Sequence, residues 1–275
     1  MNAVNPLKQY FRRPALYLTL PSKGQGYAEG VIEFPENGEL PIYPMTAIDE
    51  ITSRTPDALY NGVAIAEIIK SCVPAIKKPW EILNLDLDPI LVAIRVATSG
   101  QLMEIQSYCE ACKETSKYDV NLSGMLAEFK PGEYDKPLAV DDIQVKFKPL
   151  SYREVNDANT AQFEIQRALN ALDGIEDIEE RNSKTTEIMN SINELTINLM
   201  ISTIEYIKVP DATVFDKDFI REFLISCDKN THNKIKEQNI ELRKSTEVKP
   251  LHMKCINCNH EYEQPFNINV SNFFD

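Results

Sequence analysis

The chain has 275 residues, of which 43% are hydrophobic and 26% are charged. This is the composition of a globular protein with one large domain or two smaller ones. Its 29 basic and 42 acidic residues give a formal net charge of −13. Such an excess of negative charge disfavours nonspecific binding to nucleic acid or to an anionic membrane, because both depend on basic side chains.

No segment of the sequence resembles a signal peptide or a membrane span. The longest strongly apolar stretch, residues 89–97, contains Arg95 and is far shorter than the roughly 20 residues that cross a bilayer. We therefore expect a soluble protein made in a reducing cytoplasm. In that compartment its six cysteines are thiols or metal ligands rather than disulfides.

Residues 1–45 are rich in Pro, Gly, Tyr and Phe, and they predict an extended N-terminal arm with short β-strands. The runs at 15–20 and 30–34 have the composition of strands and are separated by turn sequences. For residues 15–45, the sequence favours packing on the chain's own helices and packing on another protein equally. Residues 1–14 have no apolar periodicity, which favours docking onto a partner.

Residues 46–104 predict a helical core. Thr55 followed by Pro56 is a typical helix start, and residues 63–72 form a further helix before a proline. Asp88 and Pro89 predict the start of a third helix, residues 89–99, whose apolar side chains surround its axis. We expect this helix to be buried. A helix cap or a solvated helix face explains Asp86 and Asp88 better than an acid–base pair does.

Residues 140–249 predict an inserted helical domain. After a strand at 143–147, Ser151 opens a capping box and a helix. The acidic stretch 175–184 predicts a mobile loop or a frayed helix start. Apolar stripes from Ile188 to Ile204 then predict a long helix buried on two sides, as in a helical bundle, with Pro210 ending it. Two shorter helices follow, near 219–227 and 231–244.

The strongest chemical signal is a pair of Cys-x-x-Cys motifs, formed by Cys109 with Cys112 and by Cys255 with Cys258. Each motif lies between two stretches of strand character, the arrangement of a zinc ribbon. Two such turns supply four thiolates, the tetrahedral ligand set that suits structural zinc. About 142 residues separate the motifs, whereas a contiguous ribbon has about 15–20. The sequence thus predicts a split ribbon, residues 105–125 with 250–275, interrupted by the helical domain.

Two other readings of these cysteines remain open: two redox-active motifs, and four free thiols. Redox motifs place the reactive thiol at a helix N-terminus, which neither motif has here. His252 and His260 are better explained as solvated surface histidines than as partners of a metal ligand. Cys72 and Cys227 are read as ordinary buried thiols.

Several segments together resemble one protein family. The segments LPSKGQGY, PMTAIDEITSRTPDALYNG, SCVPAIKKPWEI and DLDPILVAIRVATSG occur in order, and KPLHMKCINCNHEYEQPFNINVSNFFD ends the chain. They resemble the T4-type baseplate hub proteins of contractile-tailed bacteriophages. The resemblance covers about 1–125 and 210–275; across 140–210 only the helical pattern corresponds.

The resemblance implies a non-enzymatic structural or assembly protein of the tail baseplate hub. Its partners would be other hub proteins, with self-association as an option, and its location the virion baseplate or the host cytoplasm during assembly. The resemblance leaves open whether it is a permanent component or an assembly chaperone. The rival function is a zinc-ribbon regulator that binds nucleic acid or polymerase.

The expected fold class is α+β and mainly helical. It combines a split four-cysteine zinc ribbon, a helical insertion and an extended arm. In the arm, Tyr10, Phe11 and Arg12 are the candidates for docking onto a neighbouring subunit, because aromatic and arginine side chains anchor protein interfaces.

Overall fold

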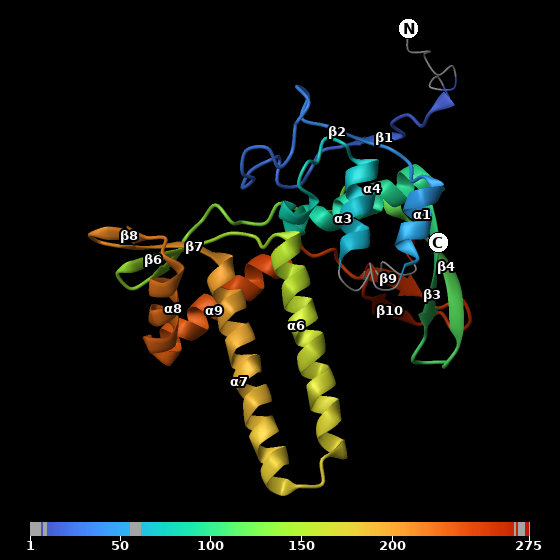
Figure 1. Ribbon diagram of the computed structural model, residues 1–275. Helices are drawn as coiled ribbons and strands as arrows, with labels where there is room; N and C mark the ends of the chain where they lie inside the picture. The colour runs from blue at the N-terminus through green and yellow to red at the C-terminus, as the bar shows by residue number, and fades with distance from the viewer. Residues whose placement is uncertain (1–6, 8–9, 56–61, 267, 269–272, 275) are drawn as a thin grey trace. The chain divides into compact units, whose positions relative to one another are not determined.

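The computed structural model describes residues 7, 10–55, 62–266, 268 and 273–274 (Figure 1). The chain divides into two compact units. Unit 1 comprises Met1–Pro79, Leu85–Lys130 and Glu247–Asp275, and unit 2 comprises Trp80–Asn84 and Pro131–Thr246. The fold is α+β, with more residues in helices than in strands, as predicted. Within the described residues, no helix has the length and apolar character needed to cross a membrane.

Unit 1 begins with a two-stranded antiparallel sheet of β1 (Leu16–Leu18) and β2 (Leu40–Ile42). Leu18, Leu40 and Ile42 are buried, so this part of the arm packs on its own unit. The predicted strand at 30–34 is wrong. Ile32 forms a single bridge with Ile76, because the chain turns at Gly30, whose φ is +75°, and again after Pro35.

The first helices in the described part of unit 1 are α1 (Ala47–Ser53), α3 (Val63–Cys72) and α4 (Asn84–Ser99). The short η2 (Pro79–Glu81) lies between the last two in sequence, where the chain passes from unit 1 to unit 2. A capping box of Thr46 and Asp49 starts α1, which the sequence analysis missed. The helix start predicted at Thr55-Pro56 runs into residues outside the described part of the chain. The prediction for α3 is confirmed.

Helix α4 begins five residues earlier than predicted, so that Pro89 lies inside it. A proline there removes one backbone hydrogen bond, but burial of the surrounding apolar side chains outweighs that loss. The predicted burial of this helix is confirmed, since Ile90, Leu91 and Ile94 are all at most 2% exposed. Arg95 is buried as well, and its Nε donates to the carbonyl oxygen of Phe273.

The expectation that Asp86 is a cap or a solvated residue is wrong. Asp86 is fully buried in α4. Its carboxylate accepts hydrogen bonds from the backbone N–H of Ser22, at 3.0 Å, and from the hydroxyl of Tyr27, at 2.7 Å. The carboxylate therefore ties the N-terminal segment to α4, a long-range contact that no local sequence pattern encodes.

Replacing Asp86 tests this connection. Burial raises the pKa of Asp86 above its ordinary value of 3.8, so ionisation costs stability, and stability should fall as the pH rises from 3.8 through the raised pKa. Asp86→Asn keeps an acceptor for Ser22 and should remove this pH dependence while changing stability by no more than about 1 kcal/mol. Asp86→Ala should cost about 1–3 kcal/mol. Urea unfolding at mildly acidic and neutral pH measures both, and equal losses in the two variants would contradict the prediction.

The remaining strands and helices in the described part of unit 1 are two β-hairpins and one short helix. Strands β3 (Leu102–Tyr108) and β4 (Thr115–Asn121) pair antiparallel and lead into α5 (Leu122–Leu126). Near the other end of the chain, β9 (Leu251–Lys254) pairs antiparallel with β10 (Glu261–Gln264). The strand character predicted after β10 falls mostly on residues outside the described part. Phe273 and Phe274 are buried and contact each other edge to face, with ring centroids 5.3 Å apart.

Unit 2 contains a four-stranded antiparallel sheet that the sequence analysis only partly predicted. Its strands are β5 (Leu138–Val140), β6 (Ile143–Phe147), β7 (Ile204–Val209) and β8 (Ala212–Val214), in the order β5-β6-β7-β8. The extension of a helix through Ile204 is wrong. From Ile204 the chain pairs with β6, a nonlocal partner that overrides the helical spacing of the preceding isoleucines.

The helices of unit 2 are α6 (Tyr152–Ala171), η3 (Leu172–Gly174), α7 (Ile178–Thr203), α8 (Lys217–Ser226) and α9 (Lys229–Thr246). Ser151 and Glu154 form the predicted capping box of α6. Helices α6 and α7 form a long antiparallel pair (Figure 1). The two-sided burial predicted for α7 is wrong for most of its length. Before Met200 only Ile188 is buried.

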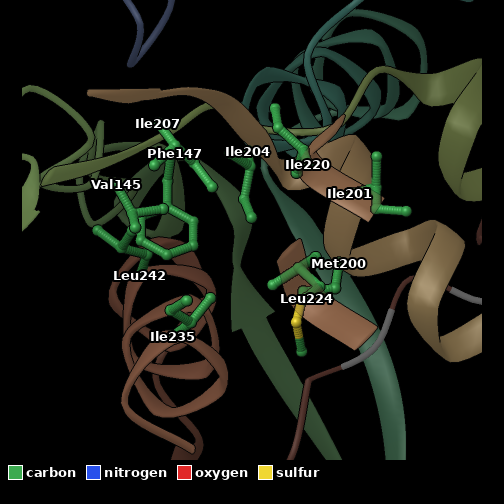
Figure 2. Packing of buried hydrophobic residues seen from close by; sticks show 10 residues of the cluster. All are labelled: Val145, Phe147, Met200, Ile201, Ile204, Ile207, Ile220, Leu224, Ile235 and Leu242. Carbon is green, nitrogen blue, oxygen red and sulfur yellow. The ribbon is translucent and has the colours of Figure 1, made fainter. Parts of the chain in front are cut away.

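The core of unit 2 lies between its sheet and the helices α8 and α9 (Figure 2). Residues from β6, β7, the C-terminal end of α7 and both shorter helices meet there. The cluster consists of Val145, Phe147, Met200, Ile201, Ile204, Ile207, Ile220, Leu224, Ile235 and Leu242.

Candidate metal centre

The two Cys-x-x-Cys motifs lie at corresponding places in the two hairpins of unit 1. Cys109 directly follows β3, and Cys112 lies in the turn before β4. Cys255 directly follows β9, and Cys258 lies in the turn before β10. All four sulfur atoms are within 4.8 Å of one another, although the motifs are far apart in the sequence.

The distances between the sulfur atoms suit a single tetrahedral ion. The Sγ atoms of Cys109 and Cys258 are 3.7 Å apart, and those of Cys112 and Cys255 are 3.5 Å apart. Four thiolates at the usual Zn–S distance of about 2.3 Å place their sulfurs about 3.8 Å apart. Cys109 and Cys255 are buried, whereas Cys258 is exposed. The four cysteines could therefore hold one metal ion at the surface of unit 1.

The backbone repeats the same pattern around both motifs. The N–H of Cys109 donates to the carbonyl oxygen of Glu114, and the carbonyl oxygen of Cys109 accepts from Lys113. In the second hairpin, the N–H of Cys255 donates to His260, and its carbonyl oxygen accepts from Asn259. Lys113 and Asn259 have φ values of 64° and 57°, the left-handed conformation that reverses each turn. This equivalence orients both pairs of sulfurs toward one point.

Hydrogen bonds beside the sulfurs join the two hairpins independently of any metal. The buried hydroxyl of Ser107, on β3, shares a 2.8 Å hydrogen bond with the hydroxyl of Tyr262. The Ser107 hydroxyl also lies 2.9 Å from the side-chain oxygen of Gln264, to which it donates. Sequence reasoning missed these residues, because a single serine in a strand gives no signal of its partner.

The surroundings of the cysteines determine what chemistry is available. A backbone N–H, that of Cys258, helps to lower the pKa of Cys255 to about 7, which favours its thiolate. Desolvation and the neighbouring thiols raise the pKa of Cys112 to about 12, so these four side chains do not all favour the thiolate without a metal. Both motifs lie between strands, so neither has the helix N-terminus of a thiol oxidoreductase. Four protein thiolates occupy all four coordination positions of a tetrahedral ion and leave none for a substrate or water. Such a site would therefore be structural rather than catalytic.

Of the two histidines near the second motif and the two cysteines outside the motifs, three have the burial that the sequence predicts. His252 and His260 are exposed, with His252 3.9 Å from Glu263 and His260 stacked on Tyr262. Cys72 is fully buried, and burial raises its pKa to about 12. Cys227 differs from the expectation of a buried thiol, because it is only partly buried at the end of α8.

The surface of the first hairpin offers little to a nucleic acid. The Nζ of Lys117 is 2.6 Å from the carboxylate of Glu104, so its charge is compensated within the hairpin. Lys113 lies over the ring of Tyr108, at 6.0 Å from its centroid. Glu110, Glu114 and Asp119 on the same hairpin are also exposed, and they would repel a phosphate backbone.

The structure separates the three candidate docking residues of the arm into two groups. Tyr10 is 78% exposed and Phe11 is 58% exposed. Arg12, in contrast, is held by its own unit: it donates to the carbonyl oxygens of Pro44 and Ser71, at 2.6 and 2.7 Å, and to the hydroxyl of Ser71 at 2.8 Å. Its guanidinium also lies 3.4 Å from the carboxylate of Asp49.

The contacts of Arg12 explain how the two aromatic residues are presented. The guanidinium fixes the chain immediately after Phe11, while the rings of Tyr10 and Phe11 stay largely in solvent. The Asp49 carboxylate serves two purposes, because it also caps α1 through the N–H of Thr46. A capping box can be predicted from a sequence, but its second role as an arginine partner cannot.

Comparison with known proteins identifies the family. A family model described as T4 bacteriophage base plate protein matches residues 35–275. No curated protein and no solved structure matches the chain. The matched region includes the four cysteines, all of unit 2, most of unit 1 and only the last part of the arm, residues 35–45. The chain therefore belongs to the T4 bacteriophage base plate protein family.

Proposed function

We propose that this protein is a non-enzymatic component or assembly factor of the baseplate hub in a contractile phage tail, and that it acts through protein–protein contacts. The observation that carries the proposal is the family match over residues 35–275. The exposed aromatic residues of the arm support it, because they are side chains of the type that anchor interfaces. The partners would be other hub proteins.

We also propose that the four-cysteine cluster binds one structural zinc ion. Its sulfur separations and the matching backbone turns support zinc, which prefers four tetrahedral thiolates. The ion would join residues 109–112 to residues 255–258, two segments of unit 1 between which unit 2 is inserted. Zinc would thus link the two parts of unit 1 that unit 2 separates in the sequence. It would also stabilise the surfaces of unit 1 that bind other hub proteins.

Purified phage particles provide the direct test of the hub role. Quantitative mass spectrometry of particles and of isolated baseplates should detect this chain together with hub proteins. Detection only in baseplate intermediates, and not in finished particles, would assign it to assembly rather than to the virion. If the chain is in neither preparation and does not co-purify with hub proteins, the proposed function is wrong.

The role of the arm has a separate test. It uses the difference between Arg12, which is bound to its own unit, and Tyr10 and Phe11, which are exposed. A chain with Tyr10→Ala and Phe11→Ala should fold normally but enter the hub complex poorly, because the exposed rings make no large contribution to its own core. We expect at least about a tenfold loss of incorporation, the effect of removing two interface anchors. Complementation of a phage that lacks the gene, with quantification of assembled particles, measures it.

The control for this variant is Ile48→Ala. Ile48 is also an exposed apolar residue, 75% exposed, but it lies on α1 rather than in the arm. It should support a normal particle yield. Normal yield from the Tyr10 and Phe11 variant as well would show that the arm does not dock.

A further inference from the structure

Unit 2 carries an exposed aromatic patch that its own core does not use. Phe215 and Phe219 are 60% and 63% exposed, and they flank the N-cap of α8. The ring of Phe215 packs in a tilted orientation against the ring of Tyr206 on β7, with centroids 5.4 Å apart. The buried face of α8 is formed by other residues, Ile220 and Leu224. Phe215 and Phe219 lie four residues apart at the start of α8, and exposed aromatic side chains of this kind are typical of protein interfaces.

The sequence that contains the patch is acidic. Residues 205–222 contain five acidic and three basic residues, and two of the basic ones are already engaged. Lys217 donates through Nζ to the carbonyl oxygens of Ile201 and Ile204, and Arg221 lies 3.1 Å from the carboxylate of Glu194. Asp218 and Glu222 lie on α8 on either side of Phe219 in sequence, and both are exposed.

The N-terminal segment of the same chain has the complementary character. Residues 1–14 contain three basic and no acidic residues, together with Tyr10 and Phe11. Arg12 is bound to unit 1, which leaves both rings projecting from that unit, 78% and 58% exposed. Even without Arg12, whose charge is paired with Asp49 of its own unit, residues 1–14 contain two basic and no acidic residues. A basic, aromatic segment and an acidic, aromatic patch therefore match in both charge and apolar character.

We propose that the arm of one copy docks on the patch formed by Tyr206, Phe215 and Phe219 in a second copy of this chain. This inference rests on the proposed function and names the neighbour that receives the arm. The two surfaces differ, so the contact is head to tail. Such contacts either close into a ring or continue as a chain of subunits, and only closure gives a finite assembly.

The test uses the full-length chain with its metal and two variants, each defective in one surface. The first carries Tyr10→Ala and Phe11→Ala, and the second carries Phe215→Ala and Phe219→Ala. Analytical ultracentrifugation should show that the unmodified chain self-associates as its concentration rises, and that salt weakens this association. Each variant alone should associate about tenfold or more weakly.

Mixing the two variants gives the decisive result. The first variant keeps an intact patch and the second an intact arm, so an equimolar mixture should form dimers but nothing larger. Ile225→Ala is the matched control, because Ile225 is 59% exposed on the same helix but outside the patch. This control should associate as the unmodified chain does.

Three outcomes would overturn the inference: a monomeric unmodified chain at every concentration, unchanged association of both variants, or a mixture that stays monomeric. Circular dichroism and metal content establish that each variant is folded. If the chain is monomeric but the Tyr10 and Phe11 variant still fails to enter the hub, the proposed function stands and a different hub protein receives the arm.

Discussion

Replacing Cys255 with serine should release the metal from the purified protein and destabilise unit 1 by several kcal/mol. The binding energy of a structural zinc ion is available only when its ligands are held together, so it contributes directly to folding. Cys255 is fully buried, and a serine in its place would leave three thiolates and a poor fourth ligand. The segment 251–264 would then keep the hydrogen bonds of Ser107 to the first hairpin but lose the link through the metal.

Metal analysis and urea unfolding together measure this effect. The unmodified chain, purified without added metal, should contain about one zinc ion per chain, as expected for a four-thiolate site. Hydrogen exchange should speed up in β9 and β10 of the variant. Cys227→Ser is the control, because Cys227 is a partly buried thiol outside the cluster. It should retain full metal content.

Two results would rule out the zinc proposal. One is an unmodified chain without metal in which all four thiols react freely in the native state. The other is equal stability of the Cys255→Ser variant and the unmodified chain. The Cys227→Ser control separates a general effect of cysteine replacement from loss of a metal ligand.

The clustering of the four cysteines could be predicted from the sequence because its parts are local. Each Cys-x-x-Cys motif lies between two short strands, and the turn geometry depends on a few adjacent residues. The four thiols lie close together only if the two hairpins pack against each other. Two Cys-x-x-Cys motifs form one zinc ligand set, and this pattern itself predicts that the hairpins pack together. Capping boxes, such as that of Ser151 and Glu154, could be predicted for the same reason.

The wrong predictions concern residues whose structure depends on distant partners. Ile204 continues a helical apolar stripe, yet it begins a strand because β6 lies beside it. Asp86 has the sequence context of a helix start, yet it is buried by Ser22 and Tyr27. The contacts of Arg12 with residues 44, 49 and 71 could not be predicted from its basic, aromatic segment either, and its role in docking stays a prediction. Local patterns cannot show which distant groups satisfy a polar side chain.

Helix α4 provides the second large expected effect. Ile94 has no exposed surface and Leu91 is 2% exposed, and both are surrounded by the apolar residues of unit 1. Replacing either with alanine leaves a cavity that a close-packed core cannot fill. We expect a loss of about 2–5 kcal/mol in the free energy of unfolding for each.

Ile48→Ala is the matched control for Ile94→Ala, since it removes the same atoms from a side chain that is 75% exposed on α1. Its effect should stay within about 0.5 kcal/mol. Urea unfolding of the three variants and of the unmodified chain, with metal content measured in each, separates core packing from loss of the metal. If Ile94→Ala and Leu91→Ala each cost less than about 0.5 kcal/mol, α4 is not the core of unit 1. A large loss with full metal content would show that the apolar core around α4 contributes to stability separately from the zinc site.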